Sequence, residues 1–241
     1  MKLRKQVLKF DFEGYVLNRV THDEFLVELA KKSGASYMID SRVDRVEENT
    51  AYLKNGETLT AKIIVDAGGH NGPIRRDYWT EKSMKIPVKF VLMEGDFGEA
   101  VELHFGSMAP GGYAWMFPKQ SGANIGLGIQ RNFAKGKSLN QFTDEFISKY
   151  DGDITFQGAG SLPMSGTIKK FVKNNYMLVG DSAGMVLPSN GAGITIAMIG
   201  GRIAGQVISE NLKNGTPREN YEKLWKKQMG KVMRNSKRSF K

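Results

Sequence analysis

The segment of this chain best suited to chemistry is residues 178–205, which join a carboxylate to a glycine-rich turn and a helix. An apolar run ending at Val179 predicts a short buried strand, and Gly180 and Asp181 follow it directly. The next helix has small residues at every fourth position, so they share one face that a backbone or a flat ring can approach closely. These small residues are Gly193, Ala197, Gly201 and Gly205. The start of such a helix offers free N–H groups and partial positive charge, which suit an anion.

This segment resembles the second flavin-binding signature of the FAD-dependent reductases and hydroxylases that share the p-hydroxybenzoate hydroxylase fold. In that family, the Asp of the Gly-Asp pair bonds the ribityl chain of FAD, and the next helix points its N-terminus at the isoalloxazine ring. The resemblance implies that Asp181 is the ribityl ligand and that amides of Ala192–Ile194 face the flavin. The implied cofactor-binding residues here are Gly180, Asp181, Pro188, Gly191, Ala192, Gly193 and Ile194. A glycine-rich helix packed on a sheet, without a ligand, is the alternative.

A second glycine-rich loop, residues 67–76, follows a short β-branched run at 62–66 that is typical of a central parallel strand. In doubly wound sheets, ligands bind beyond the C-terminal ends of such strands. The loop resembles the Asp-Gly motif of the same family, although Gly68 and Gly72 stand where the motif has Asp and Ser. The resemblance therefore implies only a backbone role near the cofactor. The residues that keep this role are Ala67 and Gly69.

The first part of the chain predicts a helix and a small β unit. A capping box at Thr21–Glu24 predicts a helix that Gly34 ends. Its predicted buried stripe is Phe25, Leu26, Leu29 and Ala30. Strands are predicted at 36–40 and 43–47, and Asn55-Gly56 predicts a hairpin turn.

From about residue 85 the pattern changes to short, often alternating runs separated by turns, which predicts an antiparallel sheet. The runs cover residues 87–95, 100–105, 113–118, 123–131 and 154–162. An amphipathic helix is predicted at 139–150. Its inner side comprises Phe142, Phe146, Ile147 and Tyr150.

These patterns predict an α/β fold with an α+β insertion. Residues 1–84 and 160–211 are expected to form an FAD-binding domain with a partial parallel sheet and helices. Residues 85–159 are expected to form an antiparallel substrate-binding layer, and 212–241 to begin a basic helical region.

A run of aromatic residues in the predicted insertion indicates which family of these flavoenzymes the chain resembles. Tyr113, Trp115 and Phe117 alternate along one predicted strand, so they share a face, and Pro118 follows them. The run resembles the Tyr-x-Trp-x-Phe-Pro signature of the geranylgeranyl reductases, in which that face roofs an apolar tunnel beside the flavin. The resemblance implies that all four residues bind substrate and that Tyr113 and Trp115 orient it, with the Tyr113 hydroxyl as a candidate proton relay. Aromatic residues of an ordinary core are the alternative.

The same resemblance implies a flavoenzyme that transfers a hydride from reduced FAD to a carbon–carbon double bond of a polyprenyl chain. The implied substrates are geranylgeranyl chains of membrane lipids or isoprenoid diphosphates, and the electron donor is a reduced nicotinamide or a ferredoxin. The implied location is cytoplasmic, peripheral on the inner face of an anionic membrane. Two alternatives remain open: a flavin-dependent monooxygenase or halogenase on the same fold, and a non-catalytic fragment that binds lipid or membrane.

Composition restricts the remaining classes of function. The 241 residues carry a net charge of +10, and ten Lys or Arg with only two Glu lie within 212–241. A nucleic-acid binder carries its basic residues on the folded core, so we expect no nucleic-acid partner. There is no Cys, and His22, His70 and His104 lack the spacing of metal ligands, so no metal site is expected.

The basic C-terminal segment also carries an apolar stripe at helical spacing. The stripe comprises Trp225, Met229, Val232, Met233 and Phe240. It is typical of a helix on an anionic membrane surface and also of a surface helix packed on its own protein, and these interpretations are compatible. A membrane-spanning helix is not expected, because Arg202 and Ser189-Asn190 interrupt the apolar run near residue 195.

Parts of the family pattern are absent from this sequence. No Gly-x-Gly-x-x-Gly unit for a dinucleotide pyrophosphate opens it. Residues 2–13 resemble the middle of a family member, and Tyr221 with Trp225 resembles a helix that continues in the family. We therefore expect an internal fragment that binds FAD poorly and folds marginally. Arg19 aligns with a family residue that approaches FAD, with a solvated ion pair as the alternative.

Overall fold

The computed structural model describes residues 6–240; residues 1–5 and 241, at the outer ends of the predicted domains, lie outside the described residues. The helices are α1 (Arg19–Lys32), α2 (Pro73–Tyr78), α3 (Leu139–Ile147), α4 (Ile194–Asn214) and α5 (Asn220–Ser239). The strands are β1 (Val43–Glu47), β2 (Thr50–Leu53), β3 (Thr58–Thr60), β4 (Ile64–Asp66), β5 (Lys85–Glu94), β6 (Glu102–His104), β7 (Tyr113–Lys119), β8 (Gly122–Gly128), β9 (Asp153–Pro163), β10 (Val172–Lys173) and β11 (Tyr176–Leu178). Short 3₁₀ turns are η1 (Gly106–Met108), η2 (Arg131–Phe133) and η3 (Gly180–Ala183).

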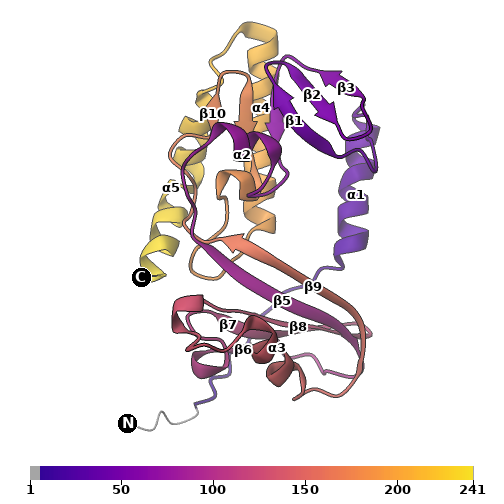
Figure 1. The fold of residues 1–241 in the computed structure, drawn as a ribbon, viewed down its shortest axis with the longest axis vertical. Coiled ribbons are helices and arrows are strands. Elements are labelled where there is room, and N and C mark those ends of the chain that lie inside the picture. Colours follow the sequence, from indigo (N-terminus) through magenta and orange to yellow (C-terminus); the bar gives the residue numbers. More distant parts are fainter. Residues whose placement is uncertain (1–5, 241) are drawn as a thin grey trace.

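Two lobes are joined by a pair of long strands, β5 and β9 (Figure 1). The upper lobe in this view holds α1, α2, α4 and α5 with two small sheets, and the lower lobe holds α3 against a five-stranded sheet. The predicted α/β fold with an antiparallel insertion is confirmed. The division of the chain into three predicted regions stays a prediction.

The parallel pairing predicted for the cofactor domain joins β4 to β11. Ile64 pairs with Tyr176 and Asp66 with Leu178, so both strands end at the same edge. The sheet order is β10-β11-β4, which makes β4 an edge strand among the described residues rather than the central strand that its β-branched run predicts. The β-branched composition identifies a parallel strand correctly but does not give its place in the sheet.

The small β unit agrees with the sequence only in part. β1, β2 and β3 form an antiparallel sheet, and the turn at Asn55-Gly56 connects β2 to β3 with Gly56 at φ +91°. The strand predicted at 36–40 is wrong, because that segment makes no strand pairing. An apolar run is therefore not sufficient for a strand when no neighbouring strand supplies the ladder of hydrogen bonds.

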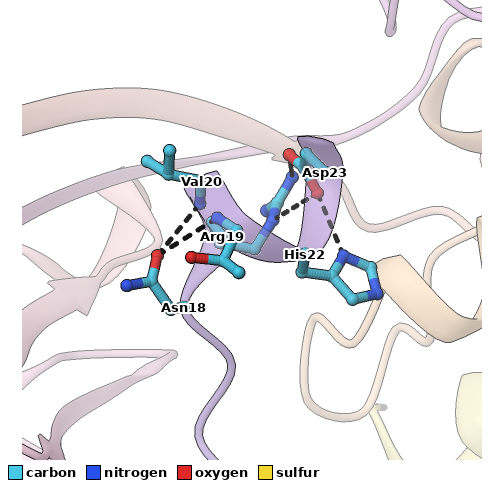
Figure 2. A network of polar contacts seen from close by, with 6 residues as sticks. Asn18, Arg19, Val20, His22 and Asp23 are labelled. Atoms are coloured by element: carbon cyan, nitrogen blue, oxygen red, sulfur yellow. Dashed lines mark hydrogen bonds and ion pairs between the residues drawn. The ribbon is translucent and has the colours of Figure 1, made fainter. Parts of the chain in front are cut away.

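The N-terminus of α1 differs from the predicted capping box. The side-chain oxygen of Asn18 accepts hydrogen bonds from the amides of Val20 (3.1 Å) and Thr21 (3.5 Å), so the helix begins at Arg19 and Thr21 lies inside it (Figure 2). Asn is at least as good an N-cap as Thr, which explains why the earlier residue starts the helix. The C-terminal end agrees with the prediction, since Gly34 adopts φ +91° directly after the helix cap.

The apolar stripe predicted to be buried on α1 is exposed instead. None of the residues of α1 is buried, and Phe25 and Leu29 are 60% and 44% exposed. Leu26 and Ala30 are only half-buried. The pattern gives the correct helical period, but burial needs an opposing surface, which the described residues do not provide.

The antiparallel sheet follows the sequence closely, with the strand order β6-β7-β8-β5-β9. One of its faces packs on α3 through Phe142 and Phe146, which are buried among apolar residues of β5, β7 and β8. Ile147 and Tyr150 pack at the edge of this core, as the predicted inner side requires. The helix ends earlier than predicted, at Ile147.

Helix α5 packs along α4 and buries most of its apolar stripe (Figure 1). Trp225, Met229 and Met233 lie in the main core, whereas Val232 is 43% exposed and Phe240 is half-buried. The interpretation of this segment as a helix packed on its own protein is therefore confirmed. Membrane contact through its cations stays a prediction.

The closest backbone approach on α4 occurs at Gly200, not on the predicted stripe of small residues. A Cβ at Gly200 would lie 2.5 Å from the Met185 sulfur and 3.4 Å from the Tyr221 hydroxyl. Gly201 and Gly205 are exposed, and nothing lies within 4 Å of a Cβ at Gly205. The periodicity finds the helix, but the packed face is one position away from the stripe.

Candidate functional site

The two glycine-rich loops predicted to bind a cofactor lie together, because the strands before them are parallel neighbours. The Val179 amide donates to the Asp66 carbonyl at 3.0 Å, which extends the pairing beyond the strand ends. The Ser182 hydroxyl donates to the same carbonyl at 2.5 Å from a fully buried position. Loop 67–72 and turn η3 are thereby held side by side at the C-terminal edge of the sheet.

The loop after β4 is held in shape by the buried carboxylate of Asp66. Its two oxygens accept hydrogen bonds from the amides of Gly68 and Arg75, both at 2.8 Å. A Cβ at Gly72 would lie 2.1 Å from one of these oxygens, so only glycine fits there. This contact gives a reason for the glycine at the motif's Ser position. The sequence analysis missed Asp66, although an Asp that ends a strand before a glycine-rich loop is a usable signal.

Asp181 lines a cavity of about 350 Å³ where β5 and β9 enter the upper lobe. His70, Lys85 and Ser182 line the same cavity, together with residues of α2 and of the segment that follows it. The Asp181 carboxylate forms no hydrogen bond or ion pair with another described residue. Burial raises the pKa of Asp181, and nearby His70 opposes that rise. An acceptor left without a partner in a cavity is suited to a ligand that carries hydroxyl groups.

His70 is a second titratable group of this cavity, which the sequence analysis did not assign. Its Nε2 lies 3.0 Å from the Ser161 hydroxyl of β9, so it connects the loop after β4 to the strand pair. Burial lowers the pKa of His70, and the Lys85 cation lowers it further, while Asp181 acts in the opposite sense. The imidazole is therefore held in its neutral form at neutral pH.

The turn before α4 holds the residues predicted to face the flavin, and one of their amides is already used within the turn. Pro188 is buried, Gly191 adopts φ +74°, and Gly193 is the N-cap of α4 without a side-chain partner. The Ala192 amide, however, donates to the Asn190 side-chain oxygen at 3.1 Å. Ala192 therefore does not offer a free amide, because Asn190 uses it to close the turn. The free N–H groups at this helix start are those from Ile194 onward.

The aromatic row of β7 lies on the sheet face opposite α3. Ring centroids are 5.7 Å apart for Tyr113 and Trp115 and 6.0 Å for Trp115 and Phe117, and all three residues are half-buried. A Cβ at Gly126 of β8 would lie 2.6 Å from the Trp115 ring, so this glycine makes room for the row. Pro118 continues the strand beyond Phe117. The face is thus partly open and apolar, unlike the closed core on the other side.

One contact joins the aromatic row to the turn before α4. The Tyr113 hydroxyl donates to the Asn190 carbonyl at 2.7 Å. Burial raises the pKa of Tyr113, so the phenol keeps its proton. The predicted substrate strand and the predicted flavin turn therefore meet, and Tyr113 positions one against the other.

Three residues predicted to contact the cofactor have no side-chain interaction with Asp181, His70 or Tyr113. Arg19 is on α1 and forms an ion pair with Asp23 at 2.8 Å, with its side chain 56% exposed (Figure 2). This is the solvated ion pair that the sequence left open. Ala67 is exposed, and Gly69 adopts φ +79° with open space beside it, so the backbone role of both near a cofactor stays a prediction.

Residues 6–240 lack two other classes of site. They contain no group of three or more acidic or His side chains placed to hold a metal ion. No described helix combines the length and apolar character needed to cross a bilayer.

Comparison with known proteins shows which family the chain resembles. The geranylgeranyl reductase catalytic domain family matches residues 84–160. Digeranylgeranylglycerophospholipid reductase 3 of Methanosphaera stadtmanae is 33% identical over 230 residues, covering 87% of this chain and 57% of that protein. Digeranylgeranylglycerophospholipid reductase 1 of Methanococcoides burtonii is 33% identical over 245 residues, covering 92% of this chain and 60% of that protein. The chain therefore spans a little more than half the length of these relatives.

Solved structures agree with this placement. A geranylgeranyl bacteriochlorophyll reductase-like protein of Thermoplasma acidophilum superposes with a TM-score of 0.85 at 26% identity, covering 97% of this chain and 65% of that one. A flavin-dependent halogenase of Brevundimonas shares the fold alone, with a TM-score of 0.69 at 17% identity over 90% of this chain and 46% of that one. The aromatic signature, the Gly-Asp turn and the shared architecture all agree: residues 84–160 match the geranylgeranyl reductase catalytic domain family, and the chain as a whole is similar to the digeranylgeranylglycerophospholipid reductases.

Proposed function

We propose that this chain belongs to an FAD-dependent reductase that saturates carbon–carbon double bonds of polyprenyl lipids. The observation that carries the proposal is the Asp181 carboxylate, which lines a cavity and has no hydrogen-bond partner among the described residues. In addition, the Tyr113 hydroxyl joins the turn before α4 to the aromatic row through its hydrogen bond to Asn190. A polar cavity beside a half-open apolar face suits a cofactor with a polyol chain and a substrate without polar groups.

The residues present fit the ribityl and ring portions of FAD. Asp181 would accept hydrogen bonds from ribityl hydroxyls, since no described residue satisfies its oxygens. The free amides and partial positive charge at the start of α4 would favour negative charge on the flavin ring. Bound and reduced, FAD supplies the hydride, and the protein supplies the geometry.

The aromatic row supports binding of the chain to be reduced. Tyr113, Trp115 and Phe117 offer a continuous apolar surface that excludes water from the double bond. Tyr113 also keeps its phenolic proton because burial raises its pKa, and its hydrogen bond fixes the turn at Asn190. We assign Tyr113 primarily to positioning, with proton relay as its second role.

The partners of this reaction are part of the proposal. The substrate is a polyprenyl lipid, the electron donor is a reduced nicotinamide or a ferredoxin, and the protein works on the inner face of an anionic membrane. The cations of α5 support membrane attraction, because its buried stripe leaves Lys and Arg on the outer side. Its core-packed Trp225 and Met229 do not take part in that contact.

An anaerobic product assay tests this function. The chain is incubated with FAD, dithionite and a geranylgeranyl glycerolipid, and the lipid is analysed by mass spectrometry. We expect a gain of two hydrogen atoms for each double bond reduced, and less product from the Asp181→Asn variant than from Asp153→Asn, whose side chain is exposed. An oxygen atom gained only when air is admitted would point to a monooxygenase instead. Lipid binding without any product would favour a non-catalytic lipid-binding protein.

A further inference from the structure

A second cavity lies at the edge of the antiparallel sheet, away from Asp181. It is a groove of about 550 Å³ between η1, η2 and α3. Pro110, Phe133 and Phe142 give it an apolar wall, and the cations of Lys135 and Lys137 lie on the same wall. No acidic side chain lines it. The combination of rings and two ammonium groups suits a molecule with an apolar chain and an anionic end.

The groove is built by two loops that are fastened to each other. The Gln130 side-chain amide donates to the Gly111 carbonyl at 2.7 Å, and the Gln130 backbone amide donates to the Pro110 carbonyl at 2.9 Å. A Cβ at Gly111 would lie 2.6 Å from the Phe133 ring, so the glycine is what lets this ring close the groove. The shape is therefore fixed by hydrogen bonds between the two loops and by the close approach of Gly111 to Phe133, rather than by the lysines.

The two lysines are in different electrostatic situations. Lys137 lies 4.4 Å from the centre of the Phe142 ring and forms an ion pair with Glu145 on α3. Lys135 is exposed and forms no ion pair with a described residue. The Glu145 side chain is 65% exposed, so its pairing is weak and an anion in the groove can replace it. The groove therefore has net positive charge available to a ligand.

The groove leads to the aromatic row. Phe105, beside η1, is 68% exposed, and its ring centroid lies 6.1 Å from that of Tyr113, the first residue of the row. Phe133 is 57% exposed at the mouth of the groove. Phe105 directly precedes Gly106, which lines the groove, so the segment at the groove also supplies the aromatic ring beside Tyr113.

We propose that this groove binds the phosphate of a polyprenyl phosphate or phospholipid through Lys135 and Lys137, while the chain of the lipid leaves past Phe105 onto the aromatic row. This inference rests on the proposed function for the identity of the chain. It adds a headgroup subsite that selects phosphorylated lipids and sets which double bonds reach Tyr113 and Trp115.

Equilibrium binding to the full chain without FAD tests the subsite. Tryptophan fluorescence is measured against geranylgeranyl monophosphate and against geranylgeraniol, each below the concentration at which it forms micelles. The variant is Lys135→Asn, because Lys135 adopts φ +50° and Asn tolerates this left-handed conformation. We expect its Kd for the phosphate to rise about threefold, and that of Lys135→Asn/Lys137→Gln about tenfold, with the Kd for the alcohol unchanged.

Lys119→Gln is the matched control, because Lys119 ends β7 at the opposite end of the aromatic row. The proposal is overturned if Lys119→Gln weakens phosphate binding and the groove variants do not, or if all variants weaken phosphate and alcohol equally. Inorganic phosphate is a separate competitor. Competition at the same concentration as the lipid phosphate would mean a free phosphate site and would also overturn the proposal. Since no flavin is present, a failed reductase assay leaves this result intact.

Discussion

At the scale of single residues, the cavity shifts the pKa values of a carboxylate and an imidazole in opposite directions. Burial raises the pKa of Asp181, whereas burial and the Lys85 cation lower the pKa of His70. Both shifts favour the neutral forms, because burial penalises the charged form of each group. The Ser161 hydroxyl gives the neutral imidazole its hydrogen-bond partner. A bound ligand that adds hydroxyl groups would instead favour the ionised carboxylate.

The lowered pKa of His70 predicts a pH dependence of stability. The unfolded chain binds a proton at the ordinary His pKa of about 6.5, while the folded chain resists it, so folding stability falls as pH drops below that value. We expect His70→Gln to lose less stability than the wild type between about pH 8 and about pH 5 in urea unfolding. Identical pH profiles for His70→Gln and the wild type would show that His70 is not held neutral.

At the scale of elements, helix α4 is positioned by one glycine and not by its whole stripe of small residues. Gly200 allows Met185 and Tyr221 to pack against the helix backbone, and the Tyr221 hydroxyl donates to the Leu178 carbonyl at 3.3 Å. This contact ties α5 to the end of β11, just before Gly180 and Asp181. The position of the cavity therefore depends on packing behind it.

Two glycine substitutions on α4 separate these roles. Gly200→Ala should destabilise the fold by about 1–3 kcal/mol, because its Cβ would lie 2.5 Å from the Met185 sulfur. Gly205→Ala meets nothing within 4 Å and should stabilise by about 0.5–1 kcal/mol, the usual gain from replacing a helical glycine. Thermal or urea unfolding measures both. Equal effects at the two positions would contradict the packing assigned to Gly200.

Element-scale patterns also explain what could be predicted from the sequence. Alternation in β5, β7 and β8 and the apolar period of α3 are local signals, and the structure follows them. The capping residue of α1 required a choice between Asn18 and Thr21, which the sequence pattern alone does not decide. Burial of Phe25 and the packing partner of Gly200 depend on what lies opposite, which is tertiary information. The hydrogen bonds by which Asp66 holds loop 67–72 in shape are tertiary information too, so the sequence pattern does not predict them.

At the scale of the whole molecule, the site depends on how two lobes meet. β5 and β9 carry the antiparallel sheet to the upper lobe, and the His70–Ser161 and Tyr113–Asn190 contacts fasten the predicted cofactor loops to it (Figure 1). Each lobe alone holds only some of the residues that the proposed reaction needs. This arrangement places the cavity at Asp181 where the two lobes meet, so the proposed function depends on that cavity first.

Titration of the chain with FAD, followed by visible absorption, tests most directly whether the Asp181 cavity binds the cofactor. With FAD in enough excess to saturate a weakly binding chain, we predict a perturbed flavin spectrum, with Asp181→Asn binding about tenfold more weakly because a charge-assisted hydrogen bond is lost. Asp153→Asn should bind like the wild type. Affinity should also fall as pH drops toward the raised pKa of Asp181, since protonation removes the acceptor charge. Equal affinity of wild type and Asp181→Asn, or an unperturbed flavin spectrum, would contradict the assignment of this cavity to the cofactor.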